Sequence, residues 1–567
     1  MRCSKKYIVF ILVLGLALVC KFYNGKDVYV EIDDFRGAML DEGDWNPLIA
    51  SSVNEKRLTA AIDSRVYSNN DSGIYMDENL NVMIPVSILR DSFNCSVHLY
   101  DSKELLIEKY SASLSMAVNE TSAIFDEEEL ELDSPMIYKA GEYYVPMEVI
   151  SKELGYSYNW DIDENTVTAA NTSGDTNILP SAYDLREKER SSSVKDQGSR
   201  GTCWAFAALT ALETSLLPEE SFEFSPDHMS LKNSFASNGD NGGQYTMSMA
   251  YLTSWQGPVL ETDDPYDGVG VDNLTAVKHI QEAQVIESKN LDKIKEAVFK
   301  YGGVQSAIYS TLQNAGSRSS FYNNVTNAYC YVGQEKPNHD VVIIGWDDNY
   351  SKENFSVGLE GDGAFICQNS WGANFGDDGV FYVSYYDTNI GVHNVVYTEI
   401  EDIDNYNNIY QSDLCGWVGQ LGYNKDTVYG ANVYTAEGDE AVEAVGFYAT
   451  GKNTEYEVYI VPEFKDTDSL QKGQRAASGK LENAGFYTID LKKAVNVAKG
   501  EKFAVVIKVT TPDSVHPLAI EYAGDESTLN VDLTDGEGYI SSLGTSWERV
   551  EETQNCNLCI KAYTKER

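Results

Sequence analysis

Cys203 stands at the junction between a Gly- and Ser-rich loop and a run with helical spacing. Residues 204–215 place small and apolar side chains on a helical pattern, and Pro218 is typical of a helix end. A helix that begins at Cys203 puts the thiol where unpaired backbone N–H groups concentrate positive potential. Because such a position and an imidazolium neighbour can lower a thiol pKa from about 8.5 to roughly 3–4, we expect a thiolate nucleophile.

A cysteine nucleophile needs a base, and the chain has six histidines. His339 directly precedes the apolar run 340–346, which is typical of a buried strand and would hold the imidazole rigidly. His228 and His279 lie in polar contexts, where surface or helix-capping roles are expected. We therefore predict that His339 is the base.

The base needs an orienting partner, and the reaction needs a site for negative charge. Asn369 can accept a hydrogen bond from the second imidazole nitrogen, and Trp371 can shield that bond from water. An attacked amide becomes a tetrahedral oxyanion, for which the backbone N–H of Cys203 and the side chain of Gln197 are candidate donors. His339 lies 136 residues after Cys203, and Asn369 lies 166 residues after Cys203. The polar loop 349–363 lies between His339 and Asn369.

Four separated blocks carry these residues in one order: KDQGSRGTCWAF, GPVLETDDPY, NHDVVIIGWDD and NSWGANFGDDGVFYV. Together they resemble the papain family of cysteine peptidases over residues 179 to 392. The resemblance implies two lobes, one helical and one a barrel-like sheet, with the cleft between them. It also implies hydrolysis of peptide bonds through a thioester, with no cofactor and no metal.

Two positions depart from the family pattern. The family usually has a disulfide between cysteines at the positions of Arg200 and Asp240. We expect an Arg200–Asp240 ion pair in its place, although an exposed pair contributes only about 0–1 kcal/mol. The paired glycines Gly242 and Gly243 are retained, and they imply a backbone edge along which an extended peptide binds, with Trp371 as a further substrate contact.

Composition limits the other possibilities. A length of 567 residues suggests three or four domains, and 43% hydrophobic residues exclude global disorder. The formal charge of -45 argues against nucleic acid as a partner, because phosphate binding needs clustered Lys and Arg. Nine irregularly spaced cysteines form no disulfide framework, so most are expected to be free thiols.

The N-terminus resembles an export signal. Arg2, Lys5 and Lys6 precede an uncharged run from Tyr7 to Cys20. Residues 1–25 are therefore predicted to be either a cleaved signal peptide or a retained membrane anchor, followed by a linker over 26–70. Both alternatives place the protein outside the cell or at the cell surface.

An internal duplication with a shift of 61 positions occupies the predicted domain 71–172, with Pro85 matching Pro146. Each copy predicts a strand, a short helix led by proline, and a second strand. This arrangement resembles the N-terminal domain of copper amine oxidases, for which surface attachment or partner binding is the implied role. His98 is the single histidine of the duplicated segment and is interpreted as structural.

Residues 401–567 change to short alternating runs that predict an antiparallel sandwich. The region resembles a lectin-like domain, so a cell-surface glycan or cell-wall ligand is an expected partner. Trp417 and Trp547 are candidates for stacking on sugars, with burial in the core as the favoured interpretation. Cys556 and Cys559 have no further ligands nearby and are interpreted as strand residues rather than a metal site.

The predicted fold class is α+β: a small duplicated α+β domain, a papain-like two-lobed peptidase domain at 179–400, and an all-β sandwich. The predicted function is an exported cysteine endopeptidase acting on protein or peptide substrates. Two alternatives remain open at this point: a surface adhesin whose peptidase domain is inactive, and a transpeptidase that uses the same residues.

Overall fold

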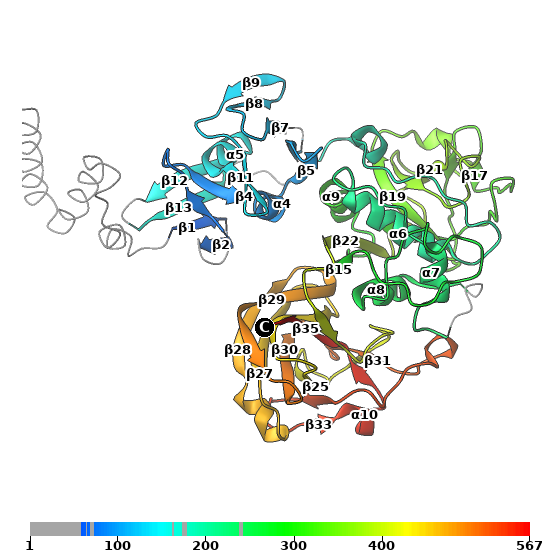
Figure 1. Cartoon of the computed structure of the whole chain (residues 1–567). Coiled ribbons are helices and arrows are strands. Elements are labelled where there is room, and N and C mark those ends of the chain that lie inside the picture. The colour runs from blue at the N-terminus through cyan, green and yellow to red at the C-terminus, as the bar shows by residue number, and fades with distance from the viewer. Residues whose placement is uncertain are drawn as a thin grey trace, which may run out of the picture. The chain divides into compact units, whose positions relative to one another are not determined.

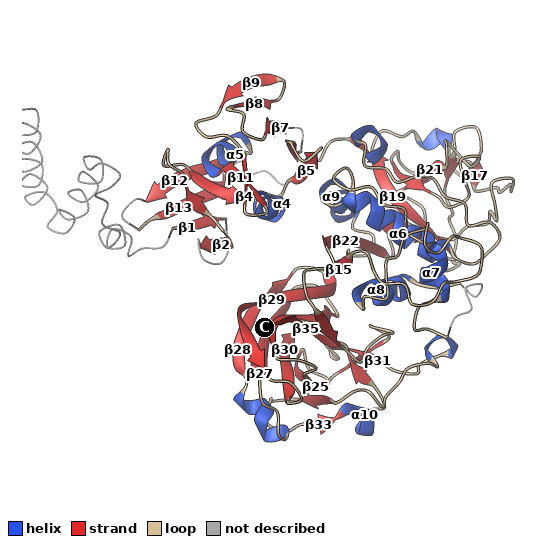
Figure 2. Ribbon diagram, viewed as in Figure 1, coloured by secondary structure: helices blue, strands red, loops and turns tan. Residues whose placement is uncertain are grey.

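The computed structural model describes residues 58–63, 65–68, 73–110, 112–161, 164–172, 179–236 and 242–567 (Figures 1 and 2). The expected signal or anchor at 1–25 lies outside these residues. The chain forms two compact units, Met1–Asn94 with Met116–Asp175, and Cys95–Ser115 with Thr176–Arg567. Among the described residues, no helix is long and apolar enough to cross a membrane.

The N-terminal region consists of short strands and two short helices. Its elements are β1 (Thr59–Ile62), β2 (Arg65–Ser68), β3 (Tyr75–Met76), β4 (Val82–Pro85), η1 (Val86–Ile88), α4 (Leu89–Ser92), β5 (Ser96–Tyr100), β6 (Glu104–Lys109), β7 (Ala112–Ala117), β8 (Ser122–Phe125), β9 (Glu128–Glu131), β10 (Ile137–Lys139), β11 (Glu142–Pro146), α5 (Met147–Glu153), β12 (Tyr156–Asp161) and β13 (Thr166–Asn171). The strand–helix–strand order of both predicted repeats is confirmed. Strands β4 and β11 of the two copies pair antiparallel, with Ile84 opposite Val145.

The predicted linker over 26–70 is wrong for its last part. Strand β1 pairs in parallel with β13 and antiparallel with β2. Ala60 and Ile62 alternate with more exposed residues and are fully buried, which is the pattern of a strand with one face on a core. Residues 59–62 and 65–68 therefore belong to the folded N-terminal unit.

The peptidase region places helices against one face of a large sheet. Its elements are β14 (Ala182–Asp184), η2 (Leu185–Lys188), α6 (Cys203–Leu216), α7 (Pro226–Leu231), α8 (Tyr245–Thr253), β15 (His279–Val285), α9 (Leu291–Lys300), β16 (Val304–Ile308), β17 (Tyr322–Asn323), β18 (Ala328–Tyr329), β19 (His339–Asp347), η3 (Lys352–Asn354), β20 (Ala364–Gln368), β21 (Val380–Ser384) and β22 (Asn394–Glu401). The predicted helix start at Cys203 and strand start at His339 are both confirmed. Helix α6 is buried along most of its length and packs on β19 and β22.

The C-terminal region is an all-β sandwich, as predicted. Its elements are β23 (Asn408–Tyr410), β24 (Gly419–Leu421), β25 (Thr427–Thr435), β26 (Glu440–Ala449), β27 (Thr454–Val461), η4 (Thr467–Lys472), β28 (Gln474–Leu481), β29 (Ala484–Val497), β30 (Lys502–Thr510), β31 (Leu518–Glu521), η5 (Glu526–Thr528), β32 (Gly538–Ser541), β33 (Glu548–Arg549), α10 (Val550–Thr553), β34 (Asn557–Leu558) and β35 (Ile560–Glu566). One sheet has the order β28-β27-β30-β25-β32-β33. Its apolar face packs on β26, β29 and β35, with Phe447 and Phe503 fully buried in the shared core.

The peptidase sheet continues into the sandwich. Strand β15 pairs antiparallel with β22 on one side and with β29 on the other, so Ala283 lies opposite Phe486. The resulting 13-stranded sheet runs from β17 through β19, β16, β22 and β15 to β29, β26, β35 and β23 (Figure 1). A shared ladder of backbone hydrogen bonds therefore joins the two parts.

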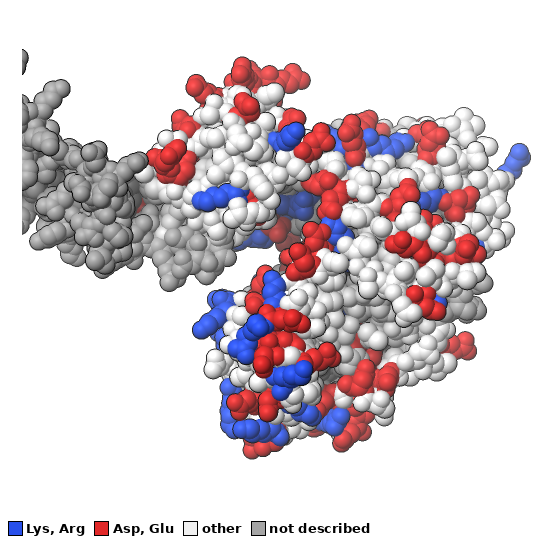
Figure 3. Space-filling model, viewed as in Figure 1, with Lys and Arg blue, Asp and Glu red and all other residues white. Residues whose placement is uncertain are grey.

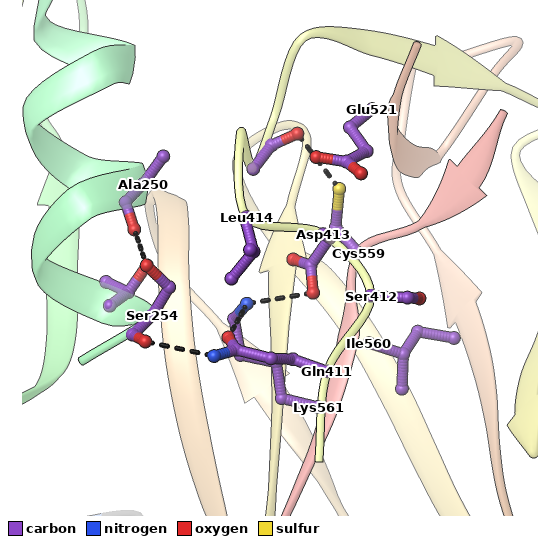
Figure 4. Close-up of polar contacts among 12 residues, drawn as sticks. Ala250, Ser254, Gln411, Ser412, Asp413, Leu414, Glu521, Cys559, Ile560 and Lys561 are labelled. Carbon is purple, nitrogen blue, oxygen red and sulfur yellow. Dashed lines mark hydrogen bonds and ion pairs between the residues drawn. The ribbon is translucent and has the colours of Figure 1, made fainter. Parts of the chain in front are cut away.

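A buried polar cluster reinforces this junction (Figure 4). The Lys561 Nζ lies 2.8 Å from Asp413 Oδ1, and both side chains are at most 1% exposed. Lys561 also donates to Gln411 Oε1 at 2.8 Å, and Gln411 Nε2 donates at 2.9 Å to the carbonyl of Ser254, the residue that follows helix α8. The cluster thus connects the last strand of the sandwich to a peptidase helix.

Several side chains singled out from the sequence have structural roles. Cys556 and Cys559 are buried free thiols flanking β34, and no group that could hold a metal ion occurs among the described residues. Cys203, Cys330, Cys367 and Cys415 are free thiols as well. Trp417 and Trp547 are half-buried. Trp417 packs against the large core cluster formed mainly by the peptidase region, and Trp547 packs against a cluster of the C-terminal region. On the visible face, acidic side chains are scattered with Lys and Arg between them (Figure 3).

Candidate active site

A cleft of about 750 Å³ opens at the start of helix α6. It is lined by the loop before the helix, by a second loop after β16, and by residues at the start of β19 and after β20. The lining residues are Asp196, Gln197, Gly198, Ser199, Gly201, Cys203, Ser310, Leu312, Gln313, Asn314, Ala315, Gly316, Asn338, His339 and Trp371. Four residues predicted from the sequence, far apart in the chain, therefore meet in one cavity.

Cys203 is the first residue of α6 and is partly exposed at the cleft. Desolvation of the thiol, followed by the charge of Asp340, raises its pKa to about 12. The backbone N–H groups of Asp340, Trp204 and Cys203 itself act in the opposite direction. The N–H groups at the helix start lower the pKa as expected, but desolvation outweighs them for the thiol taken alone. The thiolate is expected only together with an imidazolium neighbour.

The imidazole of His339 is fixed by Asn369. Its Nε2 lies 2.8 Å from Asn369 Oδ1. The same Oδ1 accepts a hydrogen bond from the backbone N–H of Ser370 at 2.8 Å, which identifies this atom as the amide oxygen. Nε2 must therefore carry the proton, and in the neutral imidazole Nδ1 is left as the acceptor.

Burial favours the neutral forms of the Cys203 thiol and the His339 imidazole. It lowers the pKa of His339 to about 4, with the bond to Asn369 acting weakly the other way. A lone thiolate and a lone imidazolium are thus both disfavoured in the cleft. A proton transfer from Cys203 Sγ to His339 Nδ1 would instead create both charges side by side, where their attraction is strong because little water screens it.

Four hydrogen bonds, two from the side chain and two from the backbone, fix the position of Gln197. Its Oε1 accepts from the hydroxyl of Ser370 at 2.5 Å, and its Nε2 donates to the carbonyl of Arg200 at 2.8 Å. Its backbone N–H donates to the Ser370 carbonyl, and its backbone carbonyl accepts from the Tyr266 hydroxyl. One N–H of the Gln197 amide remains for a group bound in the cleft, as an oxyanion donor requires.

The predicted substrate contacts have different locations. Trp371 lines the cleft and stacks on the His339 ring with centroids 4.6 Å apart, so it covers the His339–Asn369 bond. Gly243 lies against the indole of Trp204, where a Cβ atom would come within 2.4 Å, and Gly242 has a positive φ of 76°. Neither glycine is among the described residues that line the 750 Å³ cavity.

The comparisons with known proteins agree with this geometry. A family model described as papain family cysteine protease matches residues 179–400. Residues 179–400 belong to the papain family of cysteine proteases. Models described as copper amine oxidase N-terminal domain and lectin like domain match residues 75–169 and 409–564, which confirms the three resemblances and their order.

Individual relatives of the papain-family domain come from distant organisms. A viral cathepsin from Adoxophyes honmai nucleopolyhedrovirus is 27% identical over 211 residues, covering 36% of this chain and 57% of the relative. Cathepsin S of Bos taurus is 31% identical over 212 residues, covering 35% of this chain and 59% of the relative. The chain therefore spans less than two thirds of the length of these relatives.

A solved structure matches more than the papain-family domain. The cysteine protease and lectin-like domains of Cwp84, described as a surface layer associated protein of Clostridium difficile, superpose with a TM-score of 0.60 at 25% identity. The match covers 68% of this chain and 89% of that structure. The combination of a papain-family domain with a C-terminal β domain is thus shared with a known protease.

The loop that precedes Cys203 is anchored in this papain-family domain without the usual disulfide. Arg200 Nη1 lies 2.5 Å from Asp227 Oδ1, and its guanidinium lies over the Tyr266 ring at 5.1 Å. The Asp227 side chain is fully buried. Asp240, the expected partner of Arg200, lies outside the described residues.

Two histidines that were expected at the surface are buried. His228 lies in α7 with its Nδ1 2.6 Å from the Tyr251 hydroxyl, and burial lowers its pKa to about 4. His279 begins β15 and stacks on Trp255 with ring centroids 3.6 Å apart. The surface interpretation is wrong because tertiary packing encloses both rings and also buries polar sequence neighbours such as Asp227 and Gln281.

Three residues near the site were not predicted. Ser370 fixes the amides of both Asn369 and Gln197, and Tyr266 holds the loop before Cys203 through its bonds to Gln197 and Thr202. Asp340 acts electrostatically on Cys203. Ser370 and Tyr266 fall inside the family blocks, which is a usable signal, whereas the charge of Asp340 needs a structure to be placed.

Proposed function

We propose that this protein is a cysteine endopeptidase that hydrolyses peptide bonds through a thioester intermediate. The observation that carries the proposal is the bond from His339 Nε2 to Asn369 Oδ1 in a cleft that Cys203 also lines. This bond leaves Nδ1 as the proton acceptor for the cysteine. Membership of the papain family supports the same reaction.

In the proposed mechanism, Cys203 Sγ transfers its proton to His339 Nδ1 and attacks the carbonyl carbon of the substrate. The Cys203 backbone N–H and the free N–H of Gln197 stabilise the oxyanion. His339 then donates its proton to the leaving amine, and a thioester remains on Cys203. Water, deprotonated by His339, attacks the thioester and releases the acid product together with the free thiol.

The adhesin alternative, with an inactive peptidase domain, is not favoured. Cys203, His339 and Gln197 line one cleft, and Asn369 contacts His339. A protein that had lost activity would be free to lose any of these four residues. Transfer to an amine instead of water requires the same residues, so product analysis by mass spectrometry distinguishes hydrolysis from transpeptidation.

We propose three further assignments for the whole chain. Residues 1–25 export the protein, residues 59–172 and 401–567 are accessory domains that precede and follow the peptidase domain at 179–400 in the chain, and the protein acts at the cell surface. The surface-layer association of the protease with the matching domain pair supports this location. A glycan or cell-wall ligand for the C-terminal domain is part of the same proposal.

The test is covalent labelling by an epoxide inhibitor of cysteine peptidases, followed by peptide mass spectrometry. Labelling is expected on Cys203 and is expected to vanish in Cys203→Ala, together with cleavage of a protein substrate. Cys367→Ala is the matched control, because Cys367 is a fully buried cysteine of the same domain. Absence of labelling in folded wild-type protein would refute the proposal.

A further inference from the structure

Asp340 follows His339 on strand β19 and lies close to the nucleophile. Its Oδ2 accepts a hydrogen bond from Gln305 Nε2 at 2.9 Å. Gln305 Nε2 also donates to the carbonyl of Trp204 at 3.3 Å, in the first turn of helix α6. The carboxylate is therefore tied, through one amide group, to the residue that follows Cys203.

The carboxylate cannot turn away easily from this position. The hydroxyl of Ser248 in α8 lies 3.4 Å from Gln305 Oε1, so both ends of the Gln305 amide are engaged. The backbone N–H of Asp340 also acts on Cys203, because it lowers the pKa of the thiol while the carboxylate raises it. A negative charge is thus held beside the start of α6 by a network that involves three elements.

The charge of Asp340 has no cationic partner. The charge of Asp340 acts on the thiol of Cys203 on α6 and on Tyr397 on β22. His339 directly precedes it on β19, while β16 and α8 contribute the uncharged Gln305 and Ser248. Among the described residues, no Lys or Arg forms an ion pair with Asp340. Its field therefore acts on the reacting pair with little compensation.

We propose that Asp340 is a positioning residue that shifts the pH range in which Cys203 and His339 are active toward higher pH. The inference rests on the proposed function of these two residues. A nearby negative charge disfavours loss of a proton from either neighbour. It therefore raises both the pH at which the thiolate forms beside the imidazolium and the pH at which the imidazolium loses its proton.

The two limits of the pH range respond unequally. Burial raises the pKa of Asp340 itself to about 6. Below that pH Asp340 is largely protonated and exerts little field, so the acidic limit is shifted less than the alkaline limit. This asymmetry is specific to a titrating carboxylate and would not result from a structural role.

The test compares wild type with Asp340→Asn, whose amide oxygen can still accept the bond from Gln305. The measurements are kcat/KM against pH for an uncharged peptide substrate, and the rate of Cys203 alkylation by iodoacetamide, read by peptide mass spectrometry. In the variant, the alkaline limit is expected to fall by about one pH unit and the acidic limit by a smaller amount. Alkylation reports the acidic limit without any substrate, so altered substrate binding cannot imitate the result.

Two further variants make the outcome decisive. Asp340→Glu keeps the charge and is expected to keep the wild-type limits, which guards against a folding defect in Asp340→Asn. Asp347→Asn removes the same charge at the opposite end of β19 and is expected to leave both limits unchanged. Unchanged limits in folded Asp340→Asn overturn the inference, whereas wild-type protein that lacks pH-dependent alkylation of Cys203 overturns the proposed function instead.

Discussion

The molecule contains two buried polar pairs with opposite characters. His339 and Asn369 are 6% and 4% exposed, and their bond leaves His339 Nδ1 available for proton exchange. Lys561 and Asp413 are 1% and 0% exposed, and Lys561 is bound further by Gln411. The first pair keeps a reactive atom at a cleft, whereas the second is enclosed at the junction with the sandwich. Burial alone therefore does not identify a functional group; an atom left open to a cavity does.

The largest effect is expected from breaking the first pair. His339→Ala removes the proton acceptor, so kcat/KM should fall by about 10⁴-fold or more, since the members of such a set act as a unit. Thermal stability should change by only about 1 kcal/mol. Initial rates on a peptide substrate and a thermal melt measure both quantities. A variant that keeps a tenth of the wild-type rate would show that His339 is not the base.

Breaking the Lys561–Asp413 pair should lower stability and leave activity unchanged. Lys561→Met leaves the Asp413 carboxylate buried without its cation, which costs about 3–5 kcal/mol of stability. The folded variant should keep its kcat/KM, because the pair does not line the cleft. Urea unfolding and initial rates test the two statements.

The control for this change is an exposed lysine. Lys452 pairs with Glu287, and their side chains are 61% and 47% exposed. Lys452→Met should therefore alter stability by at most about 1 kcal/mol. Equal effects of Lys561→Met and Lys452→Met would mean that the enclosed pair is no more important than a surface pair.

A rise in pH should lower stability somewhat less than Lys561→Met does. Burial, followed by the charge of Asp413, raises the pKa of Glu521 at this junction from 4.5 to about 7. Between these two values the unfolded chain has lost the proton that the folded protein retains, so stability falls as pH rises. The loss attributable to Glu521 is about 3 kcal/mol, absent below pH 4.5 and complete above pH 7.

Glu521→Gln sharpens the comparison, because it removes the titrating group and keeps its shape. Its stability should be nearly independent of pH in this range, as measured by urea unfolding at intervals between pH 4.5 and 7. A pH dependence equal to that of wild type would assign the effect to other groups. Activity in the cleft should follow its own pH limits in both proteins.

Some of this protein was readable from short stretches of sequence. Helix α6 begins at Cys203 because small and apolar residues at helical spacing end near Pro218. Strand β19 begins at His339, and the apolar residues 341–346 that follow are all buried. The strands of the sandwich follow from their alternation. These features are local, so neighbouring residues determine them.

Other features needed the folded chain. The last part of the linker expected over residues 26–70 is folded instead, because β1 pairs with β13, more than 100 residues away, and no local pattern specifies a distant partner. His228 and His279 are enclosed by Tyr251 and Trp255, although their sequence neighbours are polar. The N–H groups at the helix start lower the pKa of Cys203 and desolvation raises it, and the extent of desolvation depends on everything packed around the sulfur.

By itself, the sequence determined which residue types are present and in what order: Gln197, Cys203, His339 and Asn369 in papain-like blocks, between a duplicated module and a β-rich region. Only the tertiary structure decided that Ser370 fixes the tautomer of His339, that Asp340 lies beside Cys203, and that β15 joins the sandwich to the peptidase sheet. The physical reason is the same in each case. Electrostatic fields, burial and sheet pairing depend on distances in space, and these become defined only when remote segments pack together.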